Sequence, residues 1–313
     1  MKTAVYVLLI VGLLVGCKNA SETSANSPIY DSYQTVSLLG DTLWSKTPSE
    51  KLQITWQAKK EAFENDPDDL EKLIWYGRFT AYKGDYRGAI DLYTKGLAQF
   101  PNEPRLLRHR GHRYITVREF DKAITDLSLA AQLIENTENQ IEEDGMPNAQ
   151  NIPVSTLHGN IYYHLGLAHY LNRNMPKALE AYEKCLSTSP NADNVVSATH
   201  WIYMINRRLG RTETANDYLK NIHKDMNVIE NFAYHKACLF YKGLLPLDSI
   251  YDSKAENNAS NSAIKYAVGN WFWYNGKPAQ GKEIYHEILK GEDWASFGYL
   301  AAEADIAKPF VSK

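Results

Sequence analysis

Similar residues recur along this chain at intervals of 34 positions. Four pairs share this separation: Pro67 with Pro101, Gly77 with Gly111, Tyr86 with Phe120, and Ala89 with Ala123. A fixed period of this size indicates an array of small helical units, each of which buries its apolar face against its neighbours. The 313-residue chain can therefore fold without a single central core.

The order of residues within one period resembles the tetratricopeptide repeat, a pair of antiparallel helices. If Leu70 is position 1, Gly77 supplies the small residue at position 8, Gly84 the turn, Tyr86 the aromatic and Ala89 the second small residue. The resemblance implies an all-α fold: a right-handed superhelix, or α-solenoid, of about five helix pairs. Small residues would let the two helices of a pair approach closely, while larger residues fill the gaps between them.

The same pattern divides the chain into segments. Repeats are expected near residues 70–103, 104–137, 159–192, 196–229 and 262–295, with a leading helix in 48–66 and a closing helix in 294–306, so that the solenoid covers 48–307. An insertion at 136–156 separates the second and third repeats and carries Glu142, Glu143 and Asp144. Long connections in compact arrays are usually functional or disordered, and this one either folds back over the groove or stays apart from it. A second interruption, at 244–261, is expected to be a loop with a short helix.

The N-terminal residues resemble a bacterial lipoprotein signal. An apolar run from Ala4 to Gly16, too short to span a bilayer, leads directly into Cys17. The resemblance implies a signal peptide at 1–16, acylation of Cys17 and a lipid anchor, followed by a polar tether over 17–47. Lys18, rather than Asp, follows the cysteine, which favours the outer membrane of the cell envelope and leaves the leaflet open. The alternative is an ordinary cleaved signal with a cysteine nearby.

Charge and cysteine content exclude some classes of protein. Lys and Arg number 34 against 37 Asp and Glu, a net charge of −3 that does not suggest a nucleic-acid partner. The basic run Arg105–Arg113 is interpreted in part as a solvated helix face. Of the three cysteines, only Cys185 and Cys238 lie within the body, and two buried thiols are preferred to a disulfide, which the sequence leaves open.

The first helix of each repeat lines the concave face in tetratricopeptide-repeat proteins, and here those positions are rich in Arg, His and Tyr. Arginine suits bidentate binding of carboxylate or phosphate groups. The resemblance therefore predicts a scaffold or adaptor that binds an acidic or carboxylate-bearing protein or peptide in a basic groove. The predicted groove residues are Arg78, Tyr82, Arg105, Arg108, His112, Asn160, Tyr163, Tyr170, His200, Arg207 and Arg208.

Other interpretations of these residues remain open. Some of the arginines could instead pair with the acidic insertion or with neighbouring helices. A small-molecule or glycan-binding protein of an uptake system would have a pocket under the 136–156 loop, lined by Tyr163, Tyr170 and Trp201. No metal site, cofactor or catalytic residue is predicted, because histidines and carboxylates do not occur at ligand spacing and no nucleophile motif is present.

Overall fold

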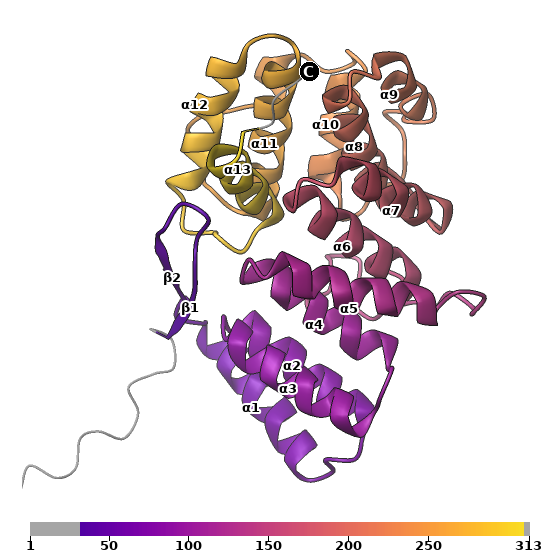
Figure 1. The fold of residues 1–313 in the computed structure, drawn as a ribbon, viewed down its shortest axis with the longest axis vertical. Coiled ribbons are helices and arrows are strands. Elements are labelled where there is room, and N and C mark those ends of the chain that lie inside the picture. Colours follow the sequence, from indigo (N-terminus) through magenta and orange to yellow (C-terminus); the bar gives the residue numbers. More distant parts are fainter. Residues whose placement is uncertain (1–31, 310–313) are drawn as a thin grey trace, which may run out of the picture.

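The computed structural model describes residues 32–309. It contains a two-stranded hairpin followed by thirteen α-helices within this range (Figure 1). The strands are β1 (Tyr33–Val36) and β2 (Thr42–Trp44). The helices are α1 (Glu50–Glu64), α2 (Leu70–Tyr82), α3 (Tyr86–Gln99), α4 (Pro104–Thr116), α5 (Phe120–Leu133), α6 (Leu157–Leu171), α7 (Met175–Ser187), α8 (Ala192–Arg208), α9 (Thr212–Tyr218), α10 (Phe232–Tyr241), α11 (Ala259–Tyr274), α12 (Pro278–Leu289) and α13 (Phe297–Ala307), with a 3-10 turn at Leu247–Ser249.

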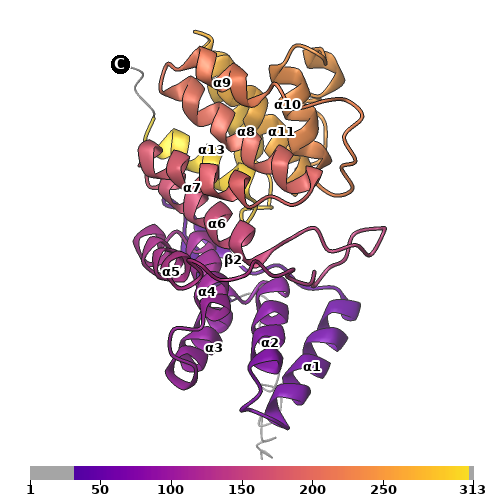
Figure 2. The same cartoon turned by 90° about the vertical axis from the view of Figure 1, so that its right-hand side faces the viewer.

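Consecutive helices pack as antiparallel pairs, and the pairs stack into a superhelix (Figures 1 and 2). The pairs are α2 with α3, α4 with α5, α6 with α7, α8 with α9, and α11 with α12. Helix α1 precedes the first pair, α10 packs between α8 and α11, and α13 closes the array. The predicted fold class, a tetratricopeptide-repeat superhelix of about five pairs with additional helices at both ends, is confirmed.

Glycines allow the paired helices to approach closely. A Cβ atom added to Gly77 would lie 2.4 Å from the ring of Tyr93, and one added to Gly166 would lie 2.7 Å from that of Tyr182. No side chain fits into these contacts without a shift of the partner. The small residues therefore have the packing role that the sequence predicted for them.

The hairpin was not predicted. Residues 32–46 fall in the segment expected to be a polar tether up to residue 47, but they pair as antiparallel strands and fold onto the helices. Thr35 donates a hydrogen bond to the carbonyl oxygen of Val117 (2.8 Å), and the side-chain oxygen of Gln34 accepts hydrogen bonds from the backbone of Tyr86 and Arg87. Cys17, the signal peptide and the start of the tether lie outside the described residues.

Helix α13 does more than end the array. Figure 1 shows it packed on α11 and α12, close to the hairpin. Its Glu303 accepts a hydrogen bond from the backbone of Leu38 in the hairpin (2.6 Å) and forms a buried ion pair with Arg118, between α4 and α5. The indole of Trp294 donates to the carbonyl oxygen of Trp44 (3.0 Å). The hairpin and α13 therefore join the first and last parts of the superhelix.

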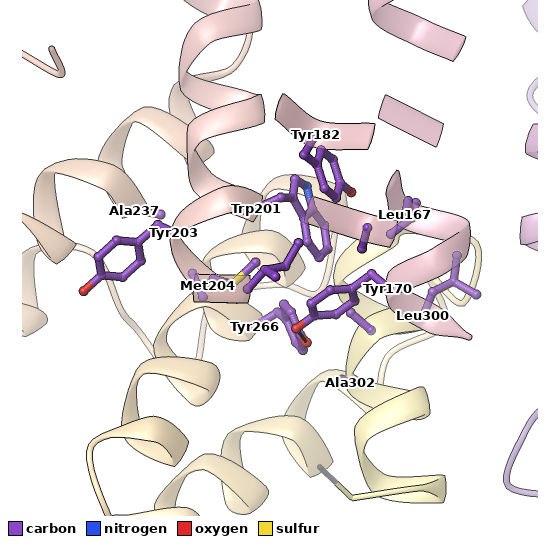
Figure 3. Close-up of a cluster of buried hydrophobic side chains, with 14 of the residues drawn as sticks. Leu167, Tyr170, Tyr182, Trp201, Tyr203, Met204, Ala237, Tyr266, Leu300 and Ala302 are labelled. Atoms are coloured by element: carbon purple, nitrogen blue, oxygen red, sulfur yellow. Dashed lines mark hydrogen bonds between the residues drawn. The ribbon is translucent and has the colours of Figure 1, made fainter. Parts of the chain in front are cut away.

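The largest buried cluster lies in the later repeats (Figure 3). Tyr182 and Trp201 stack with their ring centroids 5.6 Å apart, and the hydroxyl groups of Tyr170 and Tyr266 lie 2.6 Å apart. Burial of large aromatic side chains provides much of the packing in this half of the molecule.

Candidate partner-binding groove

Three first helices, α2, α4 and α6, carry the side chains at the centre of the candidate site. Asp69 caps α2 by accepting hydrogen bonds from the backbone of Glu71 and Lys72, and Pro104 begins α4 at a position where its missing N–H is not needed. Helix α2 contributes Arg78, and α4 contributes Arg108 and Arg113, to the face that meets the insertion at 136–156. Figure 2 shows this insertion as a long loop between α5 and α6.

The insertion lies across this face, and Glu142 is its main contact. One carboxylate oxygen of Glu142 lies 3.4 Å from a guanidinium nitrogen of Arg108 and accepts a hydrogen bond from the amide of Asn160 (2.7 Å); the other lies 3.2 Å from Nε2 of His109. Burial alone would raise the pKa of Glu142, but the charge of Arg108 and the contact with His109 outweigh it and hold that pKa below its usual range. The possibility that the insertion folds back over the groove is confirmed.

The histidines beneath the insertion are buried and neutral. Burial, reinforced by the charge of Arg108, lowers the pKa of His109 to about 3 and that of His164 to about 3. The rings of His112 and His164 lie 4.2 Å apart, and both contact the ring of Phe297 in α13. Positive charge in this region therefore comes from the arginines.

A pocket of about 210 Å³ opens beside Glu142. Its lining includes Arg78 of α2, together with Arg108 and Arg113 of α4. The lining also includes two acidic residues, Asp144 of the insertion and Glu230 before α10. The Arg78 guanidinium stacks on Trp75, with 4.4 Å to the ring centroid, and donates a hydrogen bond to the hydroxyl of Tyr82 (3.3 Å). Its Nε atom is buried without a hydrogen-bond partner.

Two of these three guanidinium groups lack a carboxylate partner. Arg108 pairs with Glu142, but Arg78 and Arg113 form no ion pair within 4.0 Å with any described residue. Arg113 contacts the ring of Tyr86, with 5.6 Å to the centroid, and burial lowers its pKa. Burial also raises the pKa of Asp144, although the charge of Arg78 opposes this shift. The pocket thus presents cationic N–H groups that can donate hydrogen bonds to a bound anion.

Two further spaces flank the insertion. One, of about 230 Å³, lies on the other side of Glu142 and is lined in part by Trp75, Arg78 and Arg105. The other, of about 190 Å³, lies beneath Val154–Thr156 and is lined in part by Asn160 and Tyr163. Each is smaller than the roughly 300–1,000 Å³ typical of pockets that enclose a whole small molecule. They suit a side chain or chain terminus rather than an entire ligand.

The structure does not bring all the predicted groove residues together. Arg78, Tyr82, Arg108 and His112 line the 210 Å³ pocket, Asn160 binds Glu142, and Tyr163 bridges Trp201 and Tyr234 through its hydroxyl group. Arg105 forms ion pairs with Glu71 and Glu103 at the edge of the groove. Arg207 donates hydrogen bonds to Tyr203 and Asn275, away from the insertion.

Three of the predicted residues are buried in the core instead of lining an open groove. Tyr170 is fully buried against Tyr266, His200 packs against Tyr241, and Arg208 forms a buried ion pair with Asp305 of α13. Later helices cover these residues: α11 packs Tyr266 against Tyr170, α10 packs Tyr241 against His200, and α13 pairs Asp305 with Arg208. The alternative pocket also differs from its prediction, because Tyr163 lines it whereas Tyr170 and Trp201 are buried behind it.

Several important residues were missed in the sequence analysis. Arg113 follows the predicted groove residue His112 and lines the pocket. From α13, Phe297 contacts His112, Glu303 pairs with Arg118, and Asp305 pairs with Arg208. A signal was present in the sequence: two carboxylates in the otherwise apolar run FGYLAAEADIA are rarely buried unless they pair with a cation.

Other predicted features can be checked within residues 32–309. Cys185 and Cys238 are free and buried, as predicted, and burial raises the pKa of the Cys185 thiol to about 12. Among the described residues, no three His, Cys, Asp or Glu side chains are grouped so that they could hold a metal ion. None of the described helices has the length and apolar character required to cross a bilayer.

The paired helices and their glycine contacts define a tetratricopeptide-repeat fold. The sequence model of the family described as tetratricopeptide repeat matches residues 159–192, which hold most of α6 and all of α7. Tetratricopeptide repeat protein 12 of Mus musculus is 27% identical over 108 residues; this match covers 34% of the chain and 12% of the mouse protein. The chain thus corresponds to about an eighth of that protein's length.

The solved structures to which this chain is similar include two tetratricopeptide-repeat proteins. A tetratricopeptide repeat protein from Parabacteroides merdae is 16% identical, with 81% of this chain and 92% of that chain covered and a TM-score of 0.47. YrrB, described as a TPR protein with an unusual peptide-binding site, is 14% identical, with 75% and 92% covered and a TM-score of 0.43.

Proposed function

We propose that this protein is a membrane-anchored scaffold that binds the acidic side chain or terminal carboxylate of a protein or peptide partner in the 210 Å³ arginine pocket. The main support for this proposal is that Arg78 and Arg113 line one pocket and have no carboxylate partner within 4.0 Å among the described residues. Arginine binds carboxylates through charge-assisted hydrogen bonds that are stronger than neutral ones. The small volume of the pocket favours a single acidic group of a larger partner over a whole small molecule.

The anchoring part of the proposal rests on Cys17 and the apolar run before it. Acylation of Cys17 would hold the chain at a bilayer of the bacterial cell envelope, and Lys18 favours the outer membrane. Mass spectrometry of the purified protein tests this directly. Diacylglycerol on Cys17, together with its loss in a Cys17→Ser variant, is the expected result.

Binding is tested with a fluorescein-labelled peptide of alternating Glu and Ala, and with a matched peptide in which Gln replaces Glu. Anisotropy should report binding of the acidic peptide only, and the affinity should fall as salt screens the pocket. Arg78→Gln and Arg113→Gln should each weaken binding by roughly tenfold or more, the loss expected for one charge-assisted contact.

Arg211 provides a matched control, because it is exposed and lies after α8, away from the pocket. The Arg211→Gln variant should bind like the unchanged protein, and thermal unfolding should show that all variants are folded. Equal binding of the two peptides, or equal loss of binding in all three variants, would rule out the arginine pocket as the binding site.

A further inference from the structure

The outer face of the β1–β2 hairpin is apolar and exposed. Tyr33 pairs with Trp44 across the strands and Val36 pairs with Thr42, so these side chains share one face. Tyr33 is 50% exposed, Val36 46% and Trp44 51%, and Leu38 and Leu39 in the turn are also exposed. The rings of Tyr33 and Trp44 meet edge to face with centroids 6.3 Å apart.

The opposite face fixes the hairpin to the body. Thr35 and Leu43 are buried there, and Gln34 accepts hydrogen bonds from the first turn of α3. The carbonyl oxygen of Trp44 accepts a hydrogen bond from Trp294. The hairpin is therefore held in place from one side, and its apolar side chains are presented on the other side without a partner in the described chain.

The chain that precedes the hairpin indicates what covers this face. The stretch from Cys17 to Ser32 spans at most about 50 Å even when fully extended. We propose that the outer face of the hairpin rests on the lipid bilayer and orients the superhelix on the membrane surface. This inference rests on the membrane anchoring proposed above, which brings the bilayer within reach of the hairpin.

The residues of this face suit the interfacial zone of a bilayer. Tyr and Trp are enriched there because their rings are apolar and their O–H or N–H groups can reach water. Asp41 is the one charged residue between Tyr33 and Trp44, so little charge has to be brought to the lipid surface. Asp41 lies in the turn and limits the contact to the headgroup level.

The test places an environment-sensitive fluorophore on the lipidated full-length protein. Val36→Cys puts the label at the centre of the outer face, and Phe232→Cys puts it on α10, at a residue with a similar exposure of 54%. Cys185 and Cys238 are buried and should not react. The labelled proteins are reconstituted with vesicles of phosphatidylethanolamine and phosphatidylglycerol, and flotation confirms their attachment.

The expected result is blue-shifted emission from position 36, quenched by doxyl-labelled lipids, and unchanged emission from position 232. Adding Tyr33→Ser and Trp44→Ser should reduce the quenching at position 36, with thermal unfolding showing that the body stays folded. A protein that floats with an unquenched label at position 36 would disprove the membrane contact while anchoring stands. A protein that neither floats nor carries lipid on Cys17 would disprove both proposals.

A blue shift at position 36 that appears without vesicles and grows with protein concentration would assign this face to a second copy of the chain instead. This outcome also overturns the membrane contact.

Discussion

A guanidinium nitrogen of Arg118 lies 2.6 Å from a carboxylate oxygen of Glu303, although the two residues are 185 positions apart. Both side chains are almost completely buried. Arg118 also donates hydrogen bonds to the carbonyl oxygens of Thr116 and Trp294. Arg118 occupies the turn between α4 and α5 with φ of 65°, where the first repeat has Gly84 with φ of 93°. A left-handed conformation that normally favours glycine is thus adopted by the residue that joins the first repeats to α13.

Replacing this arginine should strongly destabilise the protein. Arg118→Gly relieves the backbone strain, but it leaves Glu303 buried without its cation, and breaking such a pair typically costs about 3–5 kcal/mol. We therefore expect a large drop in the midpoint of thermal unfolding. Glu303→Gln in the same chain should recover part of the loss, because the uncompensated charge is then removed.

Arg173 provides the matched comparison for Arg118. It has the same left-handed turn conformation, with φ of 66°, and pairs with Asp305 of α13 (2.6 Å). Asp305 keeps a second cation, Arg208, when Arg173 is removed. Arg173→Gly should therefore destabilise the protein less than Arg118→Gly, and equal losses would contradict the role assigned to the Arg118–Glu303 pair.

The close packing of α2 against α3 predicts that a methyl group added at Gly77 changes the stability of the protein. Glycine to alanine usually stabilises a helix by about 1 kcal/mol, but the added Cβ in Gly77→Ala would lie 2.4 Å from the ring of Tyr93. The overpacking should instead cost about 1–3 kcal/mol, measured by denaturant unfolding. An unchanged or raised stability would mean that α2 and α3 can separate without loss.

The parts predicted from the sequence are those set by local periodicity. Gly77 and Ala89 recur 34 positions later as Gly111 and Ala123, so the helix pairs followed from spacing, and the resemblance to the tetratricopeptide repeat placed the arginines on the first helices. The position of α13 depends on contacts between distant residues, such as Glu303 with Arg118, which no spacing reveals. The hairpin was missed because Tyr33–Val36 and Thr42–Trp44 are short and follow a polar segment. Tyr170, His200 and Arg208 were correctly placed on the first helices, but their burial depends on α11, α10 and α13, which pack against them from later in the chain.

Neutral buried histidines predict a loss of stability in acid. Burial lowers the pKa of His200 to about 3, and the pKa of His109 and of His164 is also about 3 in the folded state, against about 6.5 when unfolded. Between these values the unfolded chain binds more protons, so the free energy of unfolding falls as the pH falls below 6.5. Each such histidine contributes up to about 1.4 kcal/mol per pH unit.

Chemical unfolding at neutral pH and near pH 5 measures this effect. A His200→Phe variant should show a shallower dependence, because one titrating group is removed. Glu142 acts in the same direction at lower pH, since its pKa is lowered in the folded state and the stability that it provides is lost as the pH falls below its unfolded pKa. A stability that stays constant from neutral pH to pH 5 would contradict the buried, neutral state of these rings.

The insertion itself should compete with an acidic partner. Glu142 lies 3.4 Å from Arg108 and partly neutralises the wall of the arginine pocket. Glu142→Gln keeps the size of the side chain but frees the charge of Arg108, so the acidic peptide should bind roughly tenfold more tightly. The protein should also become less stable, because a buried arginine loses its counter-charge.

Glu143→Gln is the matched control, because Glu143 is exposed on the same loop and forms no ion pair within 4.0 Å with the described residues. Fluorescence anisotropy measures both affinities, and equal affinities in the two variants would mean that Glu142 does not occupy the partner's site.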